Sequence, residues 1–119
     1  MNRNLLLLFC FFVFFQCKSN KSIPENILND DKMVSILTDI HLAEGYSRIA
    51  GVYGDSAKEV LPAYYELILK KHEVERKTFT ESYYYYSTEP EKMNNIMNRV
   101  IVNLSKLESG IEGKGDEKK

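Results

Sequence analysis

The 119-residue chain has only two cysteines, and both lie within its first 17 residues. Cys10 sits inside an apolar run and Cys17 lies two residues after its end, so the rest of the chain has no thiol for a disulfide, a zinc site or a nucleophile. The sequence also lacks a G-x-S-x-G motif and a glycine-rich phosphate loop, and it has only two histidines. We therefore predict that the protein is not an enzyme and has no cofactor.

An excess of one charge is also missing. The chain has 16 basic and 17 acidic residues, which gives a formal net charge of −1. Nucleic-acid-binding domains usually carry a strong basic patch, so we predict no nucleic-acid partner. Phenylalanine is scarce after residue 16, where only Phe79 remains beside eight tyrosines. Tyrosine has an apolar ring with a polar tip, and it is enriched where proteins contact one another.

A long hydrophobic run is absent as well. The apolar stretch from Leu5 to Phe15 has about 11 residues, whereas a membrane span needs about 20. A short run after Arg3, followed by Cys17 and polar residues, is typical of a secretory signal peptide over residues 1–16. The cysteine at this place resembles the lipidation site of bacterial lipoproteins, although Phe14 and Gln16 depart from the usual lipobox. The alternatives are an ordinary signal peptide or an uncleaved anchor.

Under the lipoprotein interpretation, Cys17 carries acyl chains such as palmitate, and residues 17–29 form the lipidated cysteine and a tether with a short turn at its end. Three acyl chains would hold the protein in its membrane. Lipoproteins that Bacteroidetes export to the cell surface usually have acidic residues after the cysteine, but this chain has Lys18 and Lys21. By that analogy we predict an outer-membrane protein that faces the periplasm.

Residues 30–109 are predicted to form an all-α domain, a small bundle or array of about four helices. The first helix begins at a cap formed by Asn29 or Asp30 and ends near Gly51. One of its sides carries Met33, Ile36, Leu37, Ile40 and Ala43. The nearly opposite side carries Leu42, Tyr46 and Ile49. Because both sides are apolar, we expect neighbours on both.

The remaining boundaries follow from proline, glycine and capping residues. The second helix is predicted over Pro62 to His72, with Pro62 in its first turn and a loop before it. The third is predicted over about Glu75 to Tyr86. Thr88-Glu89-Pro90-Glu91 matches a capping box, so it starts the fourth helix, which we expect Gly110 to end. Residues 110–119 are predicted to be a disordered tail.

Several segments together resemble a known family. They are Ile23-Pro24, the strings DIHLAEGY, ILKKH and LSKLE, and Glu89-Pro90-Glu91. In this combination they look like a Bacteroidetes family of short lipoproteins described as a domain of unknown function. The resemblance extends over about Ile23 to Glu108. It implies an envelope location and a helical fold, and it brings no known activity.

The most distinctive polar residues lie on one edge of the first helix. His41, Glu44 and Arg48 are spaced so that Glu44 can contact both of the others. We interpret them as a structural network that fixes packing. The alternative is a metal site completed by Asp39, Glu66 and His72, because carboxylate-bridged metal bundles use the same spacing in reverse order, E-x-x-H.

Tyrosines give a second candidate site. Four consecutive helical residues point in four directions, so at most two of the residues Tyr83 to Tyr86 can join the core. Tyr64 and Tyr65 pose the same problem. We interpret Tyr64, Tyr65, Tyr83, Tyr84, Tyr85 and Tyr86 as a possible interface. The predicted function is a non-catalytic, lipid-anchored accessory module that binds another envelope protein. The alternatives are a periplasmic chaperone-like holdase and, less favoured, a metal-binding helical protein.

Overall fold

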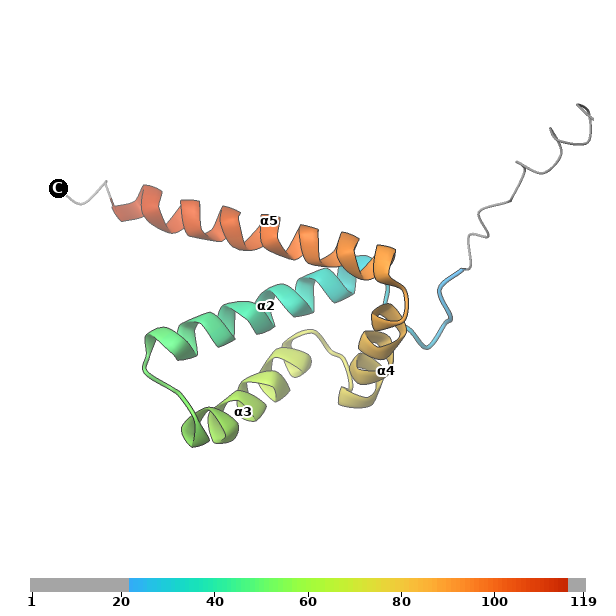
Figure 1. The fold of residues 1–119 in the computed structure, drawn as a ribbon, viewed down its shortest axis with the longest axis horizontal. Coiled ribbons are helices and arrows are strands. Elements are labelled where there is room, and N and C mark those ends of the chain that lie inside the picture. The colour runs from blue at the N-terminus through green and yellow to red at the C-terminus, as the bar shows by residue number, and fades with distance from the viewer. Residues whose placement is uncertain (1–21, 116–119) are drawn as a thin grey trace, which may run out of the picture.

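Residues 22–115 of the chain are described by a computed structural model, and within them four helices and no strands occur. The helices are α2 (Asp30–Ile49), α3 (Asp55–Lys71), α4 (Arg76–Ser87) and α5 (Pro90–Gly115) (Figure 1). The predicted all-α fold is therefore confirmed. The predicted signal peptide, the lipidation site Cys17 and the first residues of the tether lie outside the described residues.

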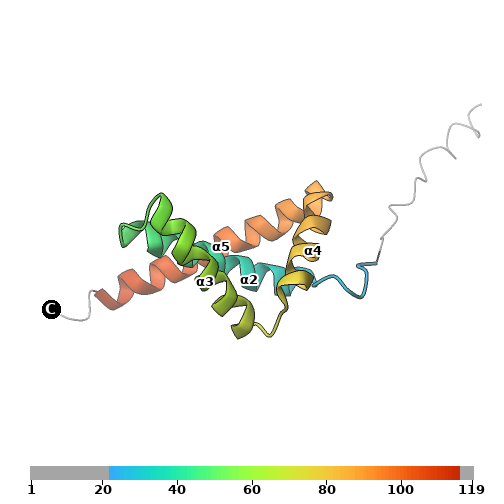
Figure 2. The same cartoon turned by 90° about the horizontal axis from the view of Figure 1, so that it is seen from below.

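Helix α2 is the central element. It packs against both α3 and α5, and Figure 2 shows that α2 and α5 cross at an angle. Five of the nine most buried apolar residues come from α2, and they include the predicted stripe Met33, Ile36, Leu37 and Ile40. The others are Leu69, Tyr86, Ile96 and Val100. Asn29 caps the helix as predicted, because its side-chain oxygen accepts a hydrogen bond from the Lys32 amide at 2.9 Å.

The second apolar side of α2 is not covered by the described part of the chain. Leu42 is 46 % exposed, Tyr46 65 % and Ile49 88 %. The expectation of neighbours on both sides is therefore wrong within residues 22–115. Helix α3 makes hydrogen bonds to Asp39 and Glu44 of α2, and the second stripe remains at the surface.

Helix α3 begins earlier than predicted. It starts at Asp55, and Pro62 lies inside it instead of in its first turn. Gly54 precedes the helix with a φ of +60°, a conformation that favours glycine. In the first turn, Lys58 and Asp55 form an ion pair at 2.9 Å. These two features place the helix start seven residues before the proline that we took as its marker.

Both predicted ends of α5 also need correction. The Thr88 hydroxyl donates to the carbonyl of Tyr85 at 2.8 Å, so Thr88 closes the end of α4 and does not begin a capping box. The carbonyl of Glu89 accepts the amide of Met93 at 3.0 Å, which places Pro90 in the first turn as predicted. Gly110 does not end the helix, since α5 continues to Gly115.

The segment before α2 is docked onto α4. The Leu28 amide donates to the Ser82 hydroxyl at 2.9 Å. The Tyr86 hydroxyl lies 2.9 Å from the Leu28 carbonyl oxygen and 2.7 Å from Asp30 Oδ1, so its single proton is shared between two acceptors. Ile27 and Leu28 pack against the core after a turn in which the Ile27 amide bonds the Pro24 carbonyl. This part of the predicted tether therefore belongs to the folded domain.

Candidate functional site

An open cleft of about 370 Å³ lies where all four helices come together. This volume is in the range of about 300–1,000 Å³ that is usual for ligand pockets. The lining residues are Leu37, Ile40, His41 and Glu44 from α2, Tyr65 and Leu69 from α3, Arg76, Phe79, Thr80 and Tyr83 from α4, and Met97 from α5. Residues far apart in the sequence thus form one site.

Glu44 is the centre of the polar wall. Its Oε1 accepts a hydrogen bond from the Tyr65 hydroxyl at 2.5 Å, and its Oε2 lies 3.3 Å from His41 Nδ1. Burial, the hydrogen bond and the negative charge of Glu44 together raise the pKa of Tyr65 to about 12. The phenol therefore stays protonated near neutral pH and remains a donor.

This arrangement alters the predicted network of His41, Glu44 and Arg48. The contact between His41 and Glu44 is present. Arg48 is exposed, and its carbonyl oxygen accepts the Tyr53 hydroxyl at 2.6 Å. The second partner of Glu44 is Tyr65, from the neighbouring helix. Sequence spacing within α2 could not reveal this partner, because it depends on how α3 packs.

The α4 side of the cleft carries two aromatic rings and an arginine that is paired with Glu66. Arg76 Nε donates to Glu66 Oε1 at 2.5 Å, and its Nη2 contacts the same oxygen. The rings of Phe79 and Tyr83 have centroids 6.2 Å apart and are tilted by 43°. Between the walls, Leu37, Ile40 and Leu69 are buried and supply an apolar floor.

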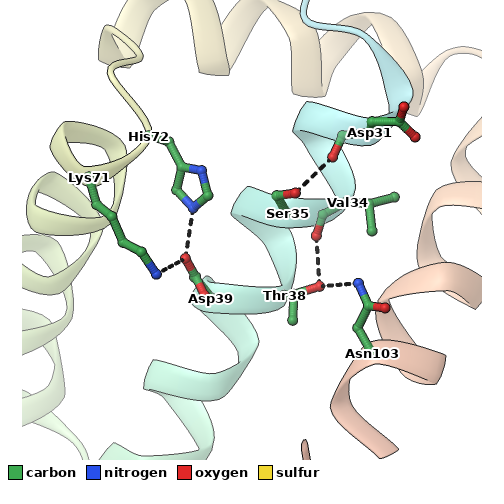
Figure 3. A network of polar contacts seen from close by, with 8 residues as sticks. All are labelled: Asp31, Val34, Ser35, Thr38, Asp39, Lys71, His72 and Asn103. Carbon is green, nitrogen blue, oxygen red and sulfur yellow. Dashed lines mark hydrogen bonds and ion pairs between the residues drawn. The ribbon is translucent and has the colours of Figure 1, made fainter. Parts of the chain in front are cut away.

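A separate polar cluster joins α2 to the end of α3 (Figure 3). Asp39 Oδ2 lies 2.7 Å from His72 Nε2 and 2.9 Å from Lys71 Nζ. Burial alone would raise the pKa of Asp39, but the hydrogen bonds and charges of Lys71 and His72 outweigh it and hold this pKa below its ordinary value. On another side of α2, the Thr38 hydroxyl donates to the Val34 carbonyl at 2.7 Å and faces Asn103 of α5.

The residues considered for a metal site are divided among these clusters. His41 pairs with Glu44, His72 pairs with Asp39, and Glu66 pairs with Arg76. Within residues 22–115, no three histidine, cysteine or acidic side chains gather closely enough to hold a metal ion. The metal-binding alternative therefore has no ligand set in the described part of the chain.

The predicted tyrosine interface is only partly available at the surface. Tyr86 is fully buried, and Tyr85 packs against the core with Lys92 Nζ 5.0 Å from its ring centroid. Tyr84 is 71 % exposed and Tyr83 is half-exposed at the cleft. The expectation that at most two of the four join the core is thus confirmed.

Tyr64 faces a different surface, which we call the outer groove. Its residues are Asp39, Leu42, Ala43, Tyr46, Tyr64, Leu67, Ile68 and Lys71. It contains Leu42 and Tyr46 from the uncovered stripe of α2, together with exposed Leu67. Tyr64 and Tyr65 are neighbours in sequence, and α3 directs them to the outer groove and the cleft respectively.

The fold and the cleft define a small helical protein with an open, partly apolar cleft. Its family model, the domain of unknown function DUF4296, matches residues 24–110, and the chain belongs to that family. The predicted membership in a family of unknown function is therefore confirmed. No curated protein and no solved structure matches the chain. Among residues 22–115, no helix combines the length and the hydropathy that a membrane span requires.

Proposed function

We propose that the protein is a non-catalytic helical module of the bacterial cell envelope that binds another envelope protein through the cleft. The observation that carries this proposal is the meeting of Tyr65, Tyr83 and an apolar floor in one open site built by four helices. Aromatic residues beside apolar pockets are the usual anchors of protein interfaces. The cleft residues lie on helices that pack together in the core, so a partner would meet a preformed site.

The proposed location follows from the sequence before the domain. We assign Cys17 as the lipidated residue of a Bacteroidetes lipoprotein in the outer membrane, with the domain facing the periplasm. Because Ile27 and Leu28 already pack against the core, residues 18–26 separate Cys17 from the domain. Metabolic labelling with a palmitate analogue tests this assignment. We expect label on the natural chain and none on Cys17→Ser, and label retained by Cys17→Ser would contradict it.

Site-specific crosslinking in native membranes tests the interaction itself. A photoreactive benzoylphenylalanine replaces Thr80 at the cleft in the full-length chain, and a matched substitution replaces Glu59 on the exposed side of α3. We expect one stoichiometric partner to be linked from Thr80 and not from Glu59. Equal crosslinking from both positions, or none from Thr80, would contradict the proposal.

The outer groove favours a second candidate, the chaperone-like holdase. Leu42, Tyr46 and Leu67 expose apolar surface there, and such surface can hold unfolded chains. Crosslinking from Leu67 separates the two functions. A mixture of unfolded envelope proteins captured at Leu67, with no single partner at Thr80, would support the holdase and reject the subunit.

A further inference from the structure

The charges around the cleft are unequal. Both Arg76 contacts go to the Glu66 carboxylate, so the charge of Arg76 is neutralised within its own pair. Glu44 is partnered by the Tyr65 phenol, which is neutral, and by His41. When His41 is neutral, the cleft therefore carries one uncompensated negative charge at Glu44. An anionic ligand would be repelled by it, and a cationic ligand would be attracted.

The surroundings of Glu44 suit a cation attached to an apolar stem. The carboxylate side chain is only 29 % exposed, so a charge that approaches it is less screened than one at the open surface. The floor of Leu37, Ile40 and Leu69 can contact methylene groups. The rings of Phe79 and Tyr83 line the same cleft, and aromatic faces attract ammonium and guanidinium groups.

We propose that the cleft binds a lysine or arginine side chain of the protein partner, with the cationic group near Glu44 and the stem on the apolar floor. This inference rests on the proposed function and names the chemistry of its partner. The cleft opens to solvent, so a side chain on the surface of a partner can enter it. Its volume of about 370 Å³ suits an occupant the size of a small ligand, which a single long side chain resembles. Long basic side chains pack their stems on apolar surface in the same way.

Short peptides test the proposal directly. The full chain is placed in nanodiscs of zwitterionic phosphatidylcholine at pH 8, where ordinary imidazoles are neutral. The probes are the acetylated, amidated tripeptides Leu-Lys-Leu, Leu-Gln-Leu and Leu-Glu-Leu. Methyl NMR of methionine reports binding, since Met97 lines the cleft and fully buried Met33 serves as the internal reference.

We expect the lysine peptide to shift the Met97 signal saturably and to bind about fivefold more tightly than the glutamine peptide, as a partly exposed ion pair allows. Glu44→Gln keeps an acceptor for Tyr65 and removes the charge, so it should abolish this preference. Glu59→Gln makes the same change at an exposed position of α3 and should leave the preference intact. A preference that persists in Glu44→Gln overturns the proposal.

The natural chain supplies a test that does not depend on a variant folding. Raising the salt from about 0.05 M to about 0.5 M should remove most of the preference for lysine over glutamine, because salt screens the attraction. Equal binding of the three peptides, or no shift of Met97, overturns the inference. If a partner crosslinked from Thr80 is retained by Glu44→Gln with undiminished yield, the inference fails while the proposed function stands. If the peptides bind as expected but no partner is crosslinked from Thr80, the proposed function fails by itself.

Discussion

The Tyr65 hydroxyl on α3 donates a 2.5 Å hydrogen bond to the Glu44 carboxylate on α2. This bond crosses the helix interface beside the cleft, so it links the stability of the domain to the shape of its site. Tyr65→Phe removes the donor and leaves the ring. We expect the free energy of unfolding to fall by about 1–2 kcal/mol, as for a hydrogen bond to a charged group.

Urea unfolding measures this effect, with Tyr84→Phe as the control. Tyr84 is largely exposed, so its variant should stay within about 0.5 kcal/mol of the natural chain. In a double-mutant cycle, Tyr65→Phe should cost little once Glu44 is replaced by alanine, because the shared bond is already lost. Equal costs in both backgrounds would show that the two residues act independently.

The lowered pKa of Asp39 leads to a prediction about the stability of the domain in acid. Its pKa in the folded state lies below the ordinary value of 3.8 because of Lys71 and His72. A depressed folded pKa means that the stabilising contribution is present above pH 3.8 and is lost as the pH falls through the folded pKa. Asp39→Asn should therefore be less stable than the natural chain at neutral pH and should approach its stability as the pH falls below 3.8 and through the folded pKa.

Unfolding curves at several pH values check the Asp39 prediction. Asp55→Asn is the matched control, because the side chain of Asp55 is 94 % exposed and its pair with Lys58 is a surface contact. We expect the difference between Asp55→Asn and the natural chain to change little with pH. An Asp39→Asn difference that stays constant as the pH is lowered well below 3.8 would show that the charge of Asp39 does not stabilise the domain.

The hydrogen bond from the Leu28 amide to the Ser82 hydroxyl should protect this amide from local unfolding. Ser82→Ala leaves the Leu28 amide without its acceptor, so amide exchange at Leu28 should accelerate by about tenfold, which corresponds to about 1.4 kcal/mol. Ser35→Ala is the control, since both serines also donate to a carbonyl four residues earlier. Exchange at Leu28 that is unchanged in Ser82→Ala would remove the proposed role of this contact.

We expect replacement of Pro62 by alanine to stabilise the domain, because this proline lies inside α3. Inside α3 it cannot donate a backbone hydrogen bond, and its ring crowds the preceding turn. Pro62→Ala should raise the free energy of unfolding by about 1–3 kcal/mol. Ala63→Gly, at the neighbouring exposed position, should instead lower it by about 1 kcal/mol. A destabilising Pro62→Ala would mean that α3 needs the proline for its shape.

The sequence was most informative where a local signal and burial agree. The stripe from Met33 to Ile40 predicted the core face of α2, and Asn29 predicted its cap, because both depend on periodicity and on a side chain that reaches the nearby backbone. The predictions based on Pro62 and Thr88 were wrong. Pro62 and Thr88 suit helix starts, but α3 already begins at Asp55, after Gly54, and the Thr88 hydroxyl donates to the carbonyl of Tyr85 at the end of α4.

The site was less predictable than the fold. The contact of His41 with Glu44 follows from spacing on one helix, but the bonds of Glu44 to Tyr65 and of Asp39 to His72 join α2 to α3. Such contacts depend on the angle at which helices pack, and a single sequence carries little information on it. Tyr86 illustrates the same limit, since it was considered for an interface and is instead fully buried against Leu28 and Asp30.

The docking of Leu28 onto α4 also has a mechanical meaning. Ser82 and Tyr86 hold the backbone of Leu28 from both its amide and its carbonyl. Tension applied to the chain before Ile23 would therefore reach α4 before it could unwind the first turn of α2. The hydrogen bonds at Leu28 would pass this tension to α4, which also lines the cleft, so pulling on the N-terminal segment would load one side of the site.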